Sequence, residues 1–183
     1  MRFSPTELSG VVVIDIEPID DDRGFFARAW CTDEFASAGL HATFVQENVG
    51  YSIRAGTLRG LHFQRAPFEE TKLVRCTAGS AWDVVVDLRP ASETYGQWVG
   101  VELSAERRNM VYVPEGCAHG YLTTADKTEV RYLTSQAYAP DAATGVRFDD
   151  EALAIAWPRE VAVVSEQDRS WPPLQSARSG AGP

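Results

Sequence analysis

Two of the three histidines lie in short, strand-like runs that contain glycine, a setting that can aim a polar side chain into the mouth of a β-barrel. His62 lies in residues 56–64 (GTLRGLHFQ), and His119 lies in residues 113–121 (VPEGCAHGY). Imidazole titrates near neutral pH, so either ring could act as a general base or acid. The alternative for each is a hydrogen-bonded histidine of the core.

Three more side chains become candidates through the residues around them. Lys72 begins the run KLVRC, in which a strand would place it on one face with Val74 and Cys76. We expect that lysine to point inward, with a solvent-facing lysine at the start of a strand as the alternative. Tyr132 could be a core tyrosine with its hydroxyl bonded to the backbone. Asp168, taken alone, is typical of an exposed loop acid.

Arg59 and His62 differ in strand parity. A regular strand would therefore place the two side chains on opposite faces of its sheet. Gly60 lies between them and permits a β-bulge that would turn one of them to the other face. The sequence leaves both arrangements open.

These residues lack the ligands of the metal site that is usual in such a barrel. Such a site needs a His-x-His pair, a carboxylate and a third histidine, but the position two residues after His62 is Gln64. A three-histidine site would also require His41 to lie close by. We therefore predict no metal and no other cofactor.

The elements that must position these residues are mainly short strands. Apolar runs rich in β-branched and aromatic residues alternate with turn residues, which favours an antiparallel sandwich or barrel. The clearest runs are residues 11–14 (VVVI), 82–88 (WDVVVDL), 98–101 (WVGV), 110–113 (MVYV) and 129–133 (EVRYL).

Two segments carry helical signals. In residues 32–39, Thr32 can cap the N-terminus, acidic residues follow in the first turn, and Gly39 suits the end. A second short helix is expected over residues 149–155. Residues 175–183 are small and polar, and we predict that they form a flexible tail on a single domain spanning residues 1–183.

Composition limits the class of protein. The chain has 183 residues, of which 44% are hydrophobic and 23% charged, as in ordinary globular proteins. Its formal net charge of −9 argues against nucleic-acid binding through a general basic surface. No apolar run approaches the ~20 residues of a membrane span, and three widely spaced cysteines form no CxxC motif. We therefore expect a soluble cytoplasmic protein that binds neither nucleic acid nor membrane.

Several longer motifs occur in an order that is typical of one family. From about Gly10 to Leu174 the chain resembles the dTDP-4-dehydrorhamnose 3,5-epimerase family of sugar-nucleotide epimerases. The motifs are residues 22–26 (DRGFF), 44–48 (FVQEN), 58–64 (LRGLHFQ), 72–76 (KLVRC), 114–120 (PEGCAHG), Tyr132 with 138–140 (YAP), 155–158 (IAWP) and 165–168 (SEQD).

The resemblance implies a fold and an assembly. The fold is all-β, a cupin-type double-stranded β-helix or jelly roll with a few short peripheral helices and no metal. The assembly is a homodimer, in which an N-terminal segment of one subunit reaches the site of its neighbour.

The resemblance also implies an isomerase that inverts C3 and C5 of dTDP-4-keto-6-deoxy-glucose through an enolate. His62 is then the base, and Asp168 pairs with it. Tyr132 is the acid on the opposite face, since a phenol with an ordinary pKa of about 10 keeps its proton at pH 7. Lys72 lies near the C4 oxygen, where a cation stabilises developing negative charge. His119 lies in the same pocket, with an electrophilic or orienting role.

Further positions match the family's substrate contacts. Arg59 matches a pyrophosphate contact, which suits the bidentate geometry of arginine. Arg23 matches a nucleotide contact that the neighbouring subunit supplies. The remaining positions are Gln46 and Asn48 as polar contacts, Tyr138 at the sugar end and Phe25 beside the nucleoside.

One departure from the family pattern concerns the nucleotide. Where the family has a glutamate two residues after its RGFF segment, this chain has Arg28. A carboxylate accepts a hydrogen bond from N3–H of thymine and an arginine cannot, whereas N3 of cytosine is itself an acceptor. A CDP-linked sugar therefore stays open as an alternative, unless Arg28 points to solvent.

Three other functions remain as alternatives. The first is an epimerase that acts at C3 or C5 alone in a specialised deoxysugar pathway. The second is a metal-dependent cupin, against which Gln64 argues. The third is a sugar-nucleotide binding protein without activity, against which the full set of base, acid and lysine argues.

Overall fold

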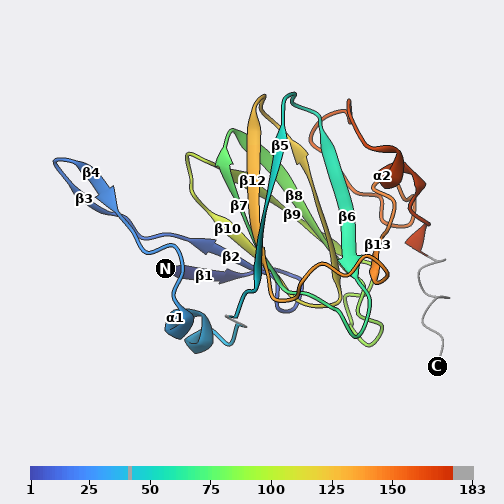
Figure 1. The fold of residues 1–183 in the computed structure, drawn as a ribbon, viewed down its shortest axis with the longest axis horizontal. Coiled ribbons are helices and arrows are strands. Elements are labelled where there is room, and N and C mark those ends of the chain that lie inside the picture. The colour runs from blue at the N-terminus through green and yellow to red at the C-terminus, as the bar shows by residue number, and fades with distance from the viewer. Residues whose placement is uncertain (41–42, 175–183) are drawn as a thin grey trace.

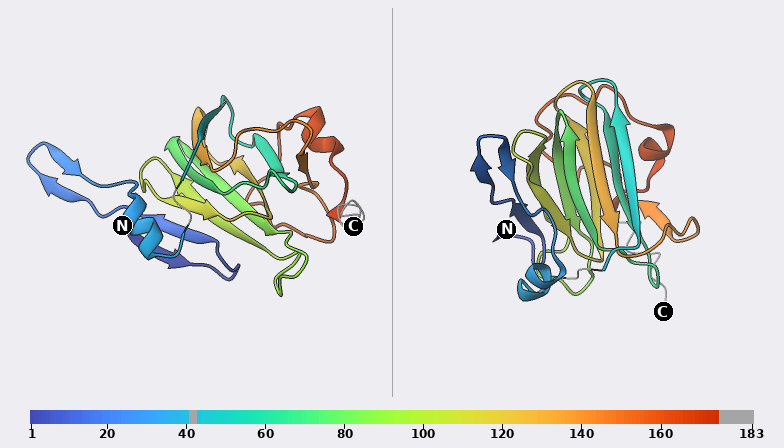
Figure 2. Two further views of the ribbon diagram at one scale, coloured as in Figure 1. Left: turned by 60° about the horizontal axis from the view of Figure 1, so that its bottom comes forward. Right: turned by 60° about the vertical axis from the view of Figure 1, so that its left-hand side comes forward.

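The computed structural model describes residues 1–40 and 43–174 and consists mainly of two antiparallel β-sheets that face each other (Figures 1 and 2). The first sheet has the order β1 (Arg2–Pro5), β2 (Val12–Asp15), β10 (Met110–Val113), β7 (Lys72–Ala78), β12 (Thr128–Thr134) and β5 (Gln46–Ser52). The second has the order β13 (Ala143–Gly145), β6 (Leu58–Gln64), β11 (Cys117–Thr123), β8 (Ser80–Asp87) and β9 (Trp98–Ser104).

Smaller elements lie around this sandwich. The hairpin of β3 (Ile19–Asp21) and β4 (Gly24–Phe26) projects away from the sheets at one end of the molecule (Figure 1). The two helices in the described part of the chain are α1 (Thr32–Ser37) and α2 (Glu166–Ser170). Neighbours within each sheet are often far apart in sequence, as in a jelly roll. The predicted all-β jelly roll with short peripheral helices is confirmed.

The main core lies between the two sheets. Val74 and Cys76 of β7 point inward and pack with Val85 of β8 and Leu103 of β9. Lys72 shares this inward face and is only 5% exposed, so the prediction of an inward-facing lysine is confirmed. The interior is therefore apolar along most of β7 and becomes charged at its N-terminal end.

Helix α1 closes the outer face of the first sheet, where Phe35 is fully buried against Ile14, Met110 and Tyr112. The predicted end at Gly39 is confirmed, since that glycine has a positive φ of 73°. The backbone N–H groups at positions 39 and 40 close the helix by donating to the carbonyls at positions 36 and 35. The predicted cap at Thr32 is wrong: Cys31 is the N-cap residue, and no side chain caps the helix.

The second predicted helix, over residues 149–155, is wrong. This segment forms turns, in which a carboxylate oxygen of Asp150 accepts from the N–H of Ala152 at 2.8 Å. Ala154 then adopts a positive φ of 46°, which a continuing α-helix does not allow. The N–H of Ala154 donates to the carbonyl of Asp150 in a single α-type turn, but the helical ladder does not continue.

A β-bulge at Gly60 places Arg59 and His62 on the same face, although their spacing in a regular strand would put them on opposite faces. Along β6 and β11, His62 pairs with His119 and Arg59 pairs with Tyr121, so residues 60 and 61 of β6 together oppose residue 120 of β11. Gly60 has a φ of 134°, and a Cβ there would lie 2.5 Å from Cα of Gly120. Only glycine fits this position, and the bulge brings the side chains of Arg59 and His62 to the same cavity.

Some predictions are not tested by the structure. His41 and the predicted tail over residues 175–183 lie outside the described residues, and the single-domain boundary stays a prediction. Within the described part of the chain, no helix is long and apolar enough to cross a membrane.

Candidate active site

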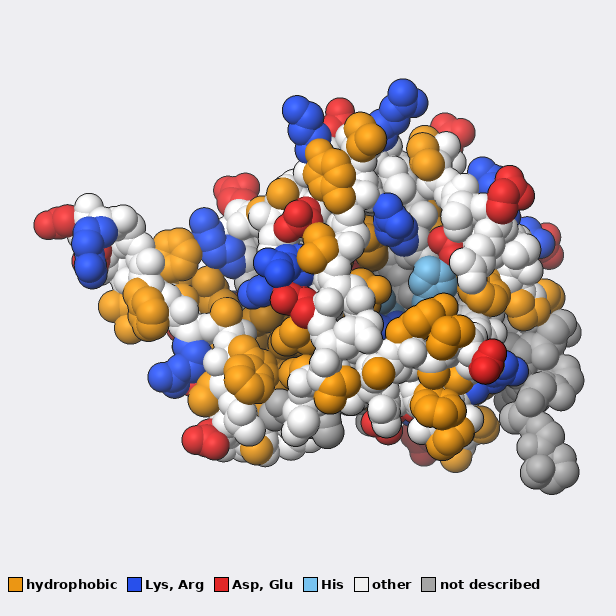
Figure 3. Space-filling model, viewed as in Figure 1, with side chains coloured by type: hydrophobic (Ala, Val, Ile, Leu, Met, Phe, Trp, Pro, Cys, Tyr) orange, Lys and Arg blue, Asp and Glu red, His pale blue; other side chains and the backbone are white. Residues whose placement is uncertain are grey.

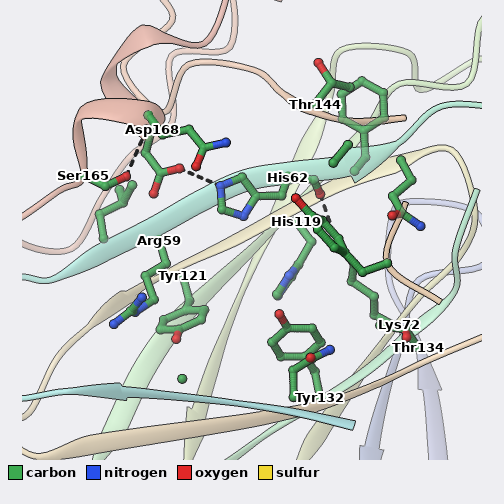
Figure 4. A pocket seen from close by; sticks show the side chains of 18 of the residues that line it. Arg59, His62, Lys72, His119, Tyr121, Tyr132, Thr134, Thr144, Ser165 and Asp168 are labelled. Atoms are coloured by element: carbon green, nitrogen blue, oxygen red, sulfur yellow. Dashed lines mark hydrogen bonds and ion pairs between the residues drawn. The ribbon is translucent and has the colours of Figure 1, made fainter. Parts of the chain in front are cut away.

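A cavity of about 670 Å³ lies between the two sheets. Figure 3 shows a histidine side chain inside a hollow on this face of the molecule. Strands β6 and β11 line one side, strands β5, β7 and β12 line the other, and the segment around α2 closes the end (Figure 4). Nine of the eleven predicted site residues line it: Gln46, Asn48, Arg59, His62, Lys72, His119, Tyr132, Tyr138 and Asp168.

His62 and Asp168 form a short contact in the cavity, with 2.6 Å between Nε2 and Oδ1 (Figure 4). Asp168 is 5% exposed and lies in the first turn of α2. Ser165 is the N-cap of this helix, and its hydroxyl accepts from the N–H of Asp168 at 3.1 Å. The expectation that Asp168, taken alone, is an exposed loop acid is wrong, because this capped turn carries it into the cavity.

Asp168 is held in its charged form. Burial raises the pKa of this carboxyl, but hydrogen bonds from His62, the N–H of Gly60 and the indole of Trp171 lower it further, and the net shift is downward. An ionised carboxylate requires a hydrogen on Nε2 of His62. The other ring nitrogen, Nδ1, is then free to accept a proton.

Lys72 is anchored by two acceptors. Its Nζ donates to the backbone oxygen of His62 at 3.2 Å and forms an ion pair with Glu70 at 3.0 Å. The lysine side chain is 6% exposed and that of Glu70 is 11% exposed. The ammonium group is thus fixed at the inner end of the cavity, within the strand layer that also carries Tyr132.

His119 belongs to a second, deeper pair with Asp83 of β8. Its Nε2 lies 2.7 Å from Oδ2 of Asp83, which is fully buried. Burial raises the pKa of Asp83, and the attraction of His119 and of Lys72 offsets this only in part. The other carboxylate oxygen, Oδ1, has no hydrogen-bond partner among the described residues.

Tyr132 lies on β12, in the sheet opposite His62 (Figure 4). Burial is the main reason that its pKa is raised, the charge of Glu70 adds to the shift, and Arg59 opposes it. The phenol therefore remains protonated at neutral pH and can donate its proton. A base and an acid thus face one cavity from different sheets.

The rim of the cavity carries polar and cationic groups. Arg59 is exposed and donates to the backbone oxygen of Tyr51 at 3.0 Å. Gln46 donates to the side-chain oxygen of Asn48 at 3.0 Å and accepts from the N–H of Tyr138 at 3.2 Å. Tyr138 is 61% exposed and lies at the mouth of the cavity.

Gln64 has a structural role that explains why a histidine is absent there. Its amide oxygen accepts from the N–H of Ala139 at 2.6 Å, and its amide nitrogen donates to the carbonyls of Phe68 and Ala137 at 2.9 and 3.3 Å. Among residues 1–40 and 43–174, no group of three or more His, Cys, Asp or Glu side chains could hold a metal ion. The absence of a catalytic metal stays a prediction.

Arg23 and Phe25 do not line the cavity of their own chain. Both lie on the β3–β4 hairpin, where the Arg23 side chain is 88% exposed and pairs with Asp21. The ring of Phe25 lies 4.6 Å from the guanidinium of Arg108. Within one chain, these two predicted contacts are therefore separate from the other nine.

Arg28 also has a partner within its own chain. Its guanidinium lies 2.7 Å from Oε1 of Glu34 on α1, and its side chain is 62% exposed. In this chain it faces solvent and α1 rather than the cavity.

Glu70, Asp83 and Trp171 contact predicted site residues but were not themselves predicted. Glu70 could have been found from its place two residues before Lys72, because residues at that spacing share a face of an extended chain. Asp83 could have been found as a lone carboxylate in an apolar strand. Trp171 had no signal, since its contact with His62 joins segments that are far apart in sequence.

Fold and site together define the class of protein. A jelly roll that presents a paired imidazole, a protonated phenol and a fixed ammonium to one small-molecule cavity has what an isomerase needs to move protons on a bound substrate. The sequence model described as dTDP-4-dehydrorhamnose 3,5-epimerase matches residues 5–176. The chain belongs to this family, and it is an epimerase of that type.

Known relatives agree with this assignment. The dTDP-4-dehydrorhamnose 3,5-epimerase of Methanothermobacter thermautotrophicus is 44% identical, over 95% of each chain. A crystal structure of the Bacillus anthracis dTDP-4-dehydrorhamnose 3,5-epimerase, with TDP and PPi bound, superimposes with a TM-score of 0.91. It is 39% identical and covers 94% of this chain and 98% of its own. The dTDP-4-dehydrorhamnose 3-epimerase of Streptomyces niveus is 39% identical, over 97% of this chain and 86% of its own.

Proposed function

We propose that the protein converts dTDP-4-keto-6-deoxy-glucose to dTDP-4-keto-rhamnose by inverting C3 and C5, without a metal. The observation that carries this proposal is the His62–Asp168 pair at 2.6 Å, in a cavity that Tyr132 faces from the opposite sheet. The names of the relatives support a dTDP-linked substrate.

Proton removal is the first step at each carbon. The C4 carbonyl acidifies the neighbouring C–H bonds, and Nδ1 of His62 takes the proton while the electron pair of that bond moves to the C4 oxygen. Asp168 stabilises the imidazolium that forms and fixes which nitrogen reacts. Lys72 lies where its ammonium can stabilise the enolate oxygen.

Return of a proton from the other side completes the inversion. The Tyr132 phenol gives its proton to the same carbon, the C4 carbonyl re-forms, and exchange with water restores both His62 and Tyr132. His119, held by buried Asp83, orients the sugar or polarises its C4 oxygen.

Substrate binding uses the rim of the cavity. Arg59 binds the pyrophosphate, whose charge the protein's net charge of −9 would otherwise repel. Gln46, Asn48 and Tyr138 hold the polar and sugar portions.

A homodimer would complete the site. The β3–β4 hairpin projects from the sheets, and its apolar residues Ile19 and Phe26 are 70% and 72% exposed. Exposed apolar side chains on a projecting hairpin support its burial against a second copy. In that dimer Arg23 and Phe25 of one subunit reach the nucleotide bound by the other.

The state of the cysteines indicates the cellular compartment of the protein. The three cysteines are free, and Cys76 and Cys117 are buried as thiols, as in a reducing compartment. We therefore infer a cytoplasmic protein.

A second candidate is epimerisation at C3 alone. The Streptomyces niveus relative carries that name at 39% identity, close to the identity of relatives named as 3,5-epimerases. The four proposed catalytic residues suit either reaction, so product analysis must separate them.

The nucleotide and the product are tested together. The protein is incubated with 4-keto-6-deoxy-glucose linked to dTDP and, separately, to CDP, and the sugar configuration of each product is determined. We expect conversion of the dTDP sugar with inversion at C3 and C5. Conversion of the CDP sugar alone would contradict the nucleotide assignment, and inversion at C3 alone would favour the second candidate.

A further inference from the structure

Trp171 contacts both members of the His62–Asp168 pair. Its indole Nε1 donates to Oδ1 of Asp168 at 3.2 Å, the same oxygen that lies 2.6 Å from His62. Its ring also meets the imidazole edge-on, with 6.0 Å between centroids and 74° between planes. The indole therefore touches the carboxylate and the ring that the carboxylate orients.

The position of the indole is set by a glycine on the strand next to His62. Gly145 of β13 pairs with His62 of β6, and a Cβ at Gly145 would lie 2.7 Å from Nε1 of Trp171. The indole thus packs directly on the backbone of β13. Since Trp171 is also the C-cap residue of α2, it connects the helix that carries Asp168 to the sheet that carries His62.

Other tryptophans use their indole N–H differently. Trp157 donates to the backbone oxygen of Phe148, and Trp98 donates to that of Leu153, both at 2.9 Å. Both acceptors are neutral carbonyls, and both indoles pack against the hydrophobic cluster that includes Leu61, Val84 and Val86. Trp171 instead donates to a charged, buried carboxylate and lines the cavity, which is more than its packing requires.

We propose that Trp171 is a positioning residue, which holds Asp168 against Nε2 of His62 so that Nδ1 faces the substrate. This inference rests on the proposed function, because it assigns His62 as the base. Without the indole N–H, Oδ1 of Asp168 keeps only the contact with His62. The N–H of Gly60 still donates to Oδ2 at 3.3 Å, so the carboxylate is held by two hydrogen bonds in place of three and is less firmly fixed against the imidazole.

The charged groups around His62 belong to several elements and remain in place when Trp171 is changed. They are Asp168 of α2, Arg59 of β6, Lys72 of β7 with Glu70 before it, His119 of β11 with Asp83 of β8 behind it, and Tyr132 of β12. A change in the pH profile of activity in a Trp171 variant therefore reports the altered contact with Asp168.

The test is Trp171→Phe, which keeps an aromatic ring and removes the N–H donor. We expect kcat to fall about tenfold with KM within about twofold of the original, and the acidic limb of the kcat/KM profile to move to higher pH by about half a unit. The matched control is Trp157→Phe, which removes an indole donor that bonds to a backbone carbonyl. We expect its pH profile to coincide with that of the unaltered enzyme.

A measurement on the unaltered enzyme covers the case in which Trp171→Phe does not fold. The indole N–H resonance of Trp171 should titrate with the acidic limb of activity, and that of Trp157 should not. Coincident pH profiles for both Phe variants, or a Trp171 resonance that ignores this titration, would overturn the inference. If the unaltered enzyme turned over no sugar nucleotide, the proposed function would fail instead.

Discussion

At the scale of single residues, the proposed base and the proposed acid lie on different sheets. His62 extends from β6 of the five-stranded sheet, and Tyr132 extends from β12 of the six-stranded sheet. Inversion at carbon requires a proton to leave from one side and return from the other. Burial and the charge of Glu70 raise the pKa of Tyr132, so the phenol keeps its proton at neutral pH and can donate it to the substrate.

The substitution Tyr132→Phe tests this division of roles. His62 is unchanged, so proton removal and exchange with heavy water should continue at C3 or C5. Inversion should fall by about two to four orders of magnitude, because the acid on the opposite face is missing. Product configuration and deuterium content, measured on the same sample, separate the two events. Equal loss of exchange and inversion would argue against Tyr132 as the acid.

At the scale of elements, two local devices aim the catalytic side chains. The bulge at Gly60 turns Arg59 and His62 to one cavity. The cap at Ser165 starts the short helix that carries Asp168 inward. Neither device contributes a reacting atom, yet each fixes the direction of a side chain that does.

Gly60→Ala should therefore damage both stability and activity. The added Cβ would lie 2.5 Å from Cα of Gly120 at a φ that alanine disfavours. We expect a loss of about 2–3 kcal/mol in the free energy of unfolding, measured by denaturant titration, with epimerase activity largely lost. An alanine variant that keeps full activity would show that the bulge does not aim His62.

Ser165→Ala should affect turnover more than global stability. The cap contributes about 1 kcal/mol to α2, and its loss frees the turn that carries Asp168. We expect kcat/KM to fall about tenfold with a small change in melting temperature. Ser170→Ala is the control, because that hydroxyl only donates to the carbonyl of Gln167 at the exposed end of the helix.

The sequence predicted the strands from local patterns, whereas most of the cavity residues were predicted through the family resemblance. Apolar runs rich in β-branched residues indicated the strands around Lys72 and Tyr132. The parity conflict between Arg59 and His62 left a bulge at Gly60 as one of two open arrangements, which the structure decides in favour of the bulge. The helix over residues 149–155 was predicted wrongly, because Asp150 bonds to nearby N–H groups in a way that helical propensity does not reveal. Trp171 was missed for a different reason, since its partner His62 is 109 positions earlier in the chain and only tertiary packing joins them.

At the scale of the whole molecule, the proposed homodimer would complete the site of each chain. Nine predicted residues meet in one cavity, whereas Arg23 and Phe25 lie on the projecting β3–β4 hairpin. Apolar residues on the hairpin are largely exposed in the single chain. Exchange of hairpins between two copies would account for both facts.

Mixing two inactive variants tests this exchange. Arg23→Ala impairs the hairpin, and His62→Ala impairs the cavity. In a mixed dimer, one site combines an intact cavity with an intact hairpin from the partner. Random mixing should restore about one quarter of the sites, provided that each variant alone has little activity. No recovery in dimers shown to be mixed would contradict a shared site.

The central claim is proton transfer at carbon by His62. It is tested most directly by incubating the protein with dTDP-4-keto-6-deoxy-glucose in heavy water and following the C3–H and C5–H signals by proton NMR. We predict that both signals are lost and the rhamnose configuration forms, and that His62→Ala abolishes the exchange while nucleotide binding remains. Exchange that persists in His62→Ala, or no exchange at either carbon with the unaltered protein, would contradict this account.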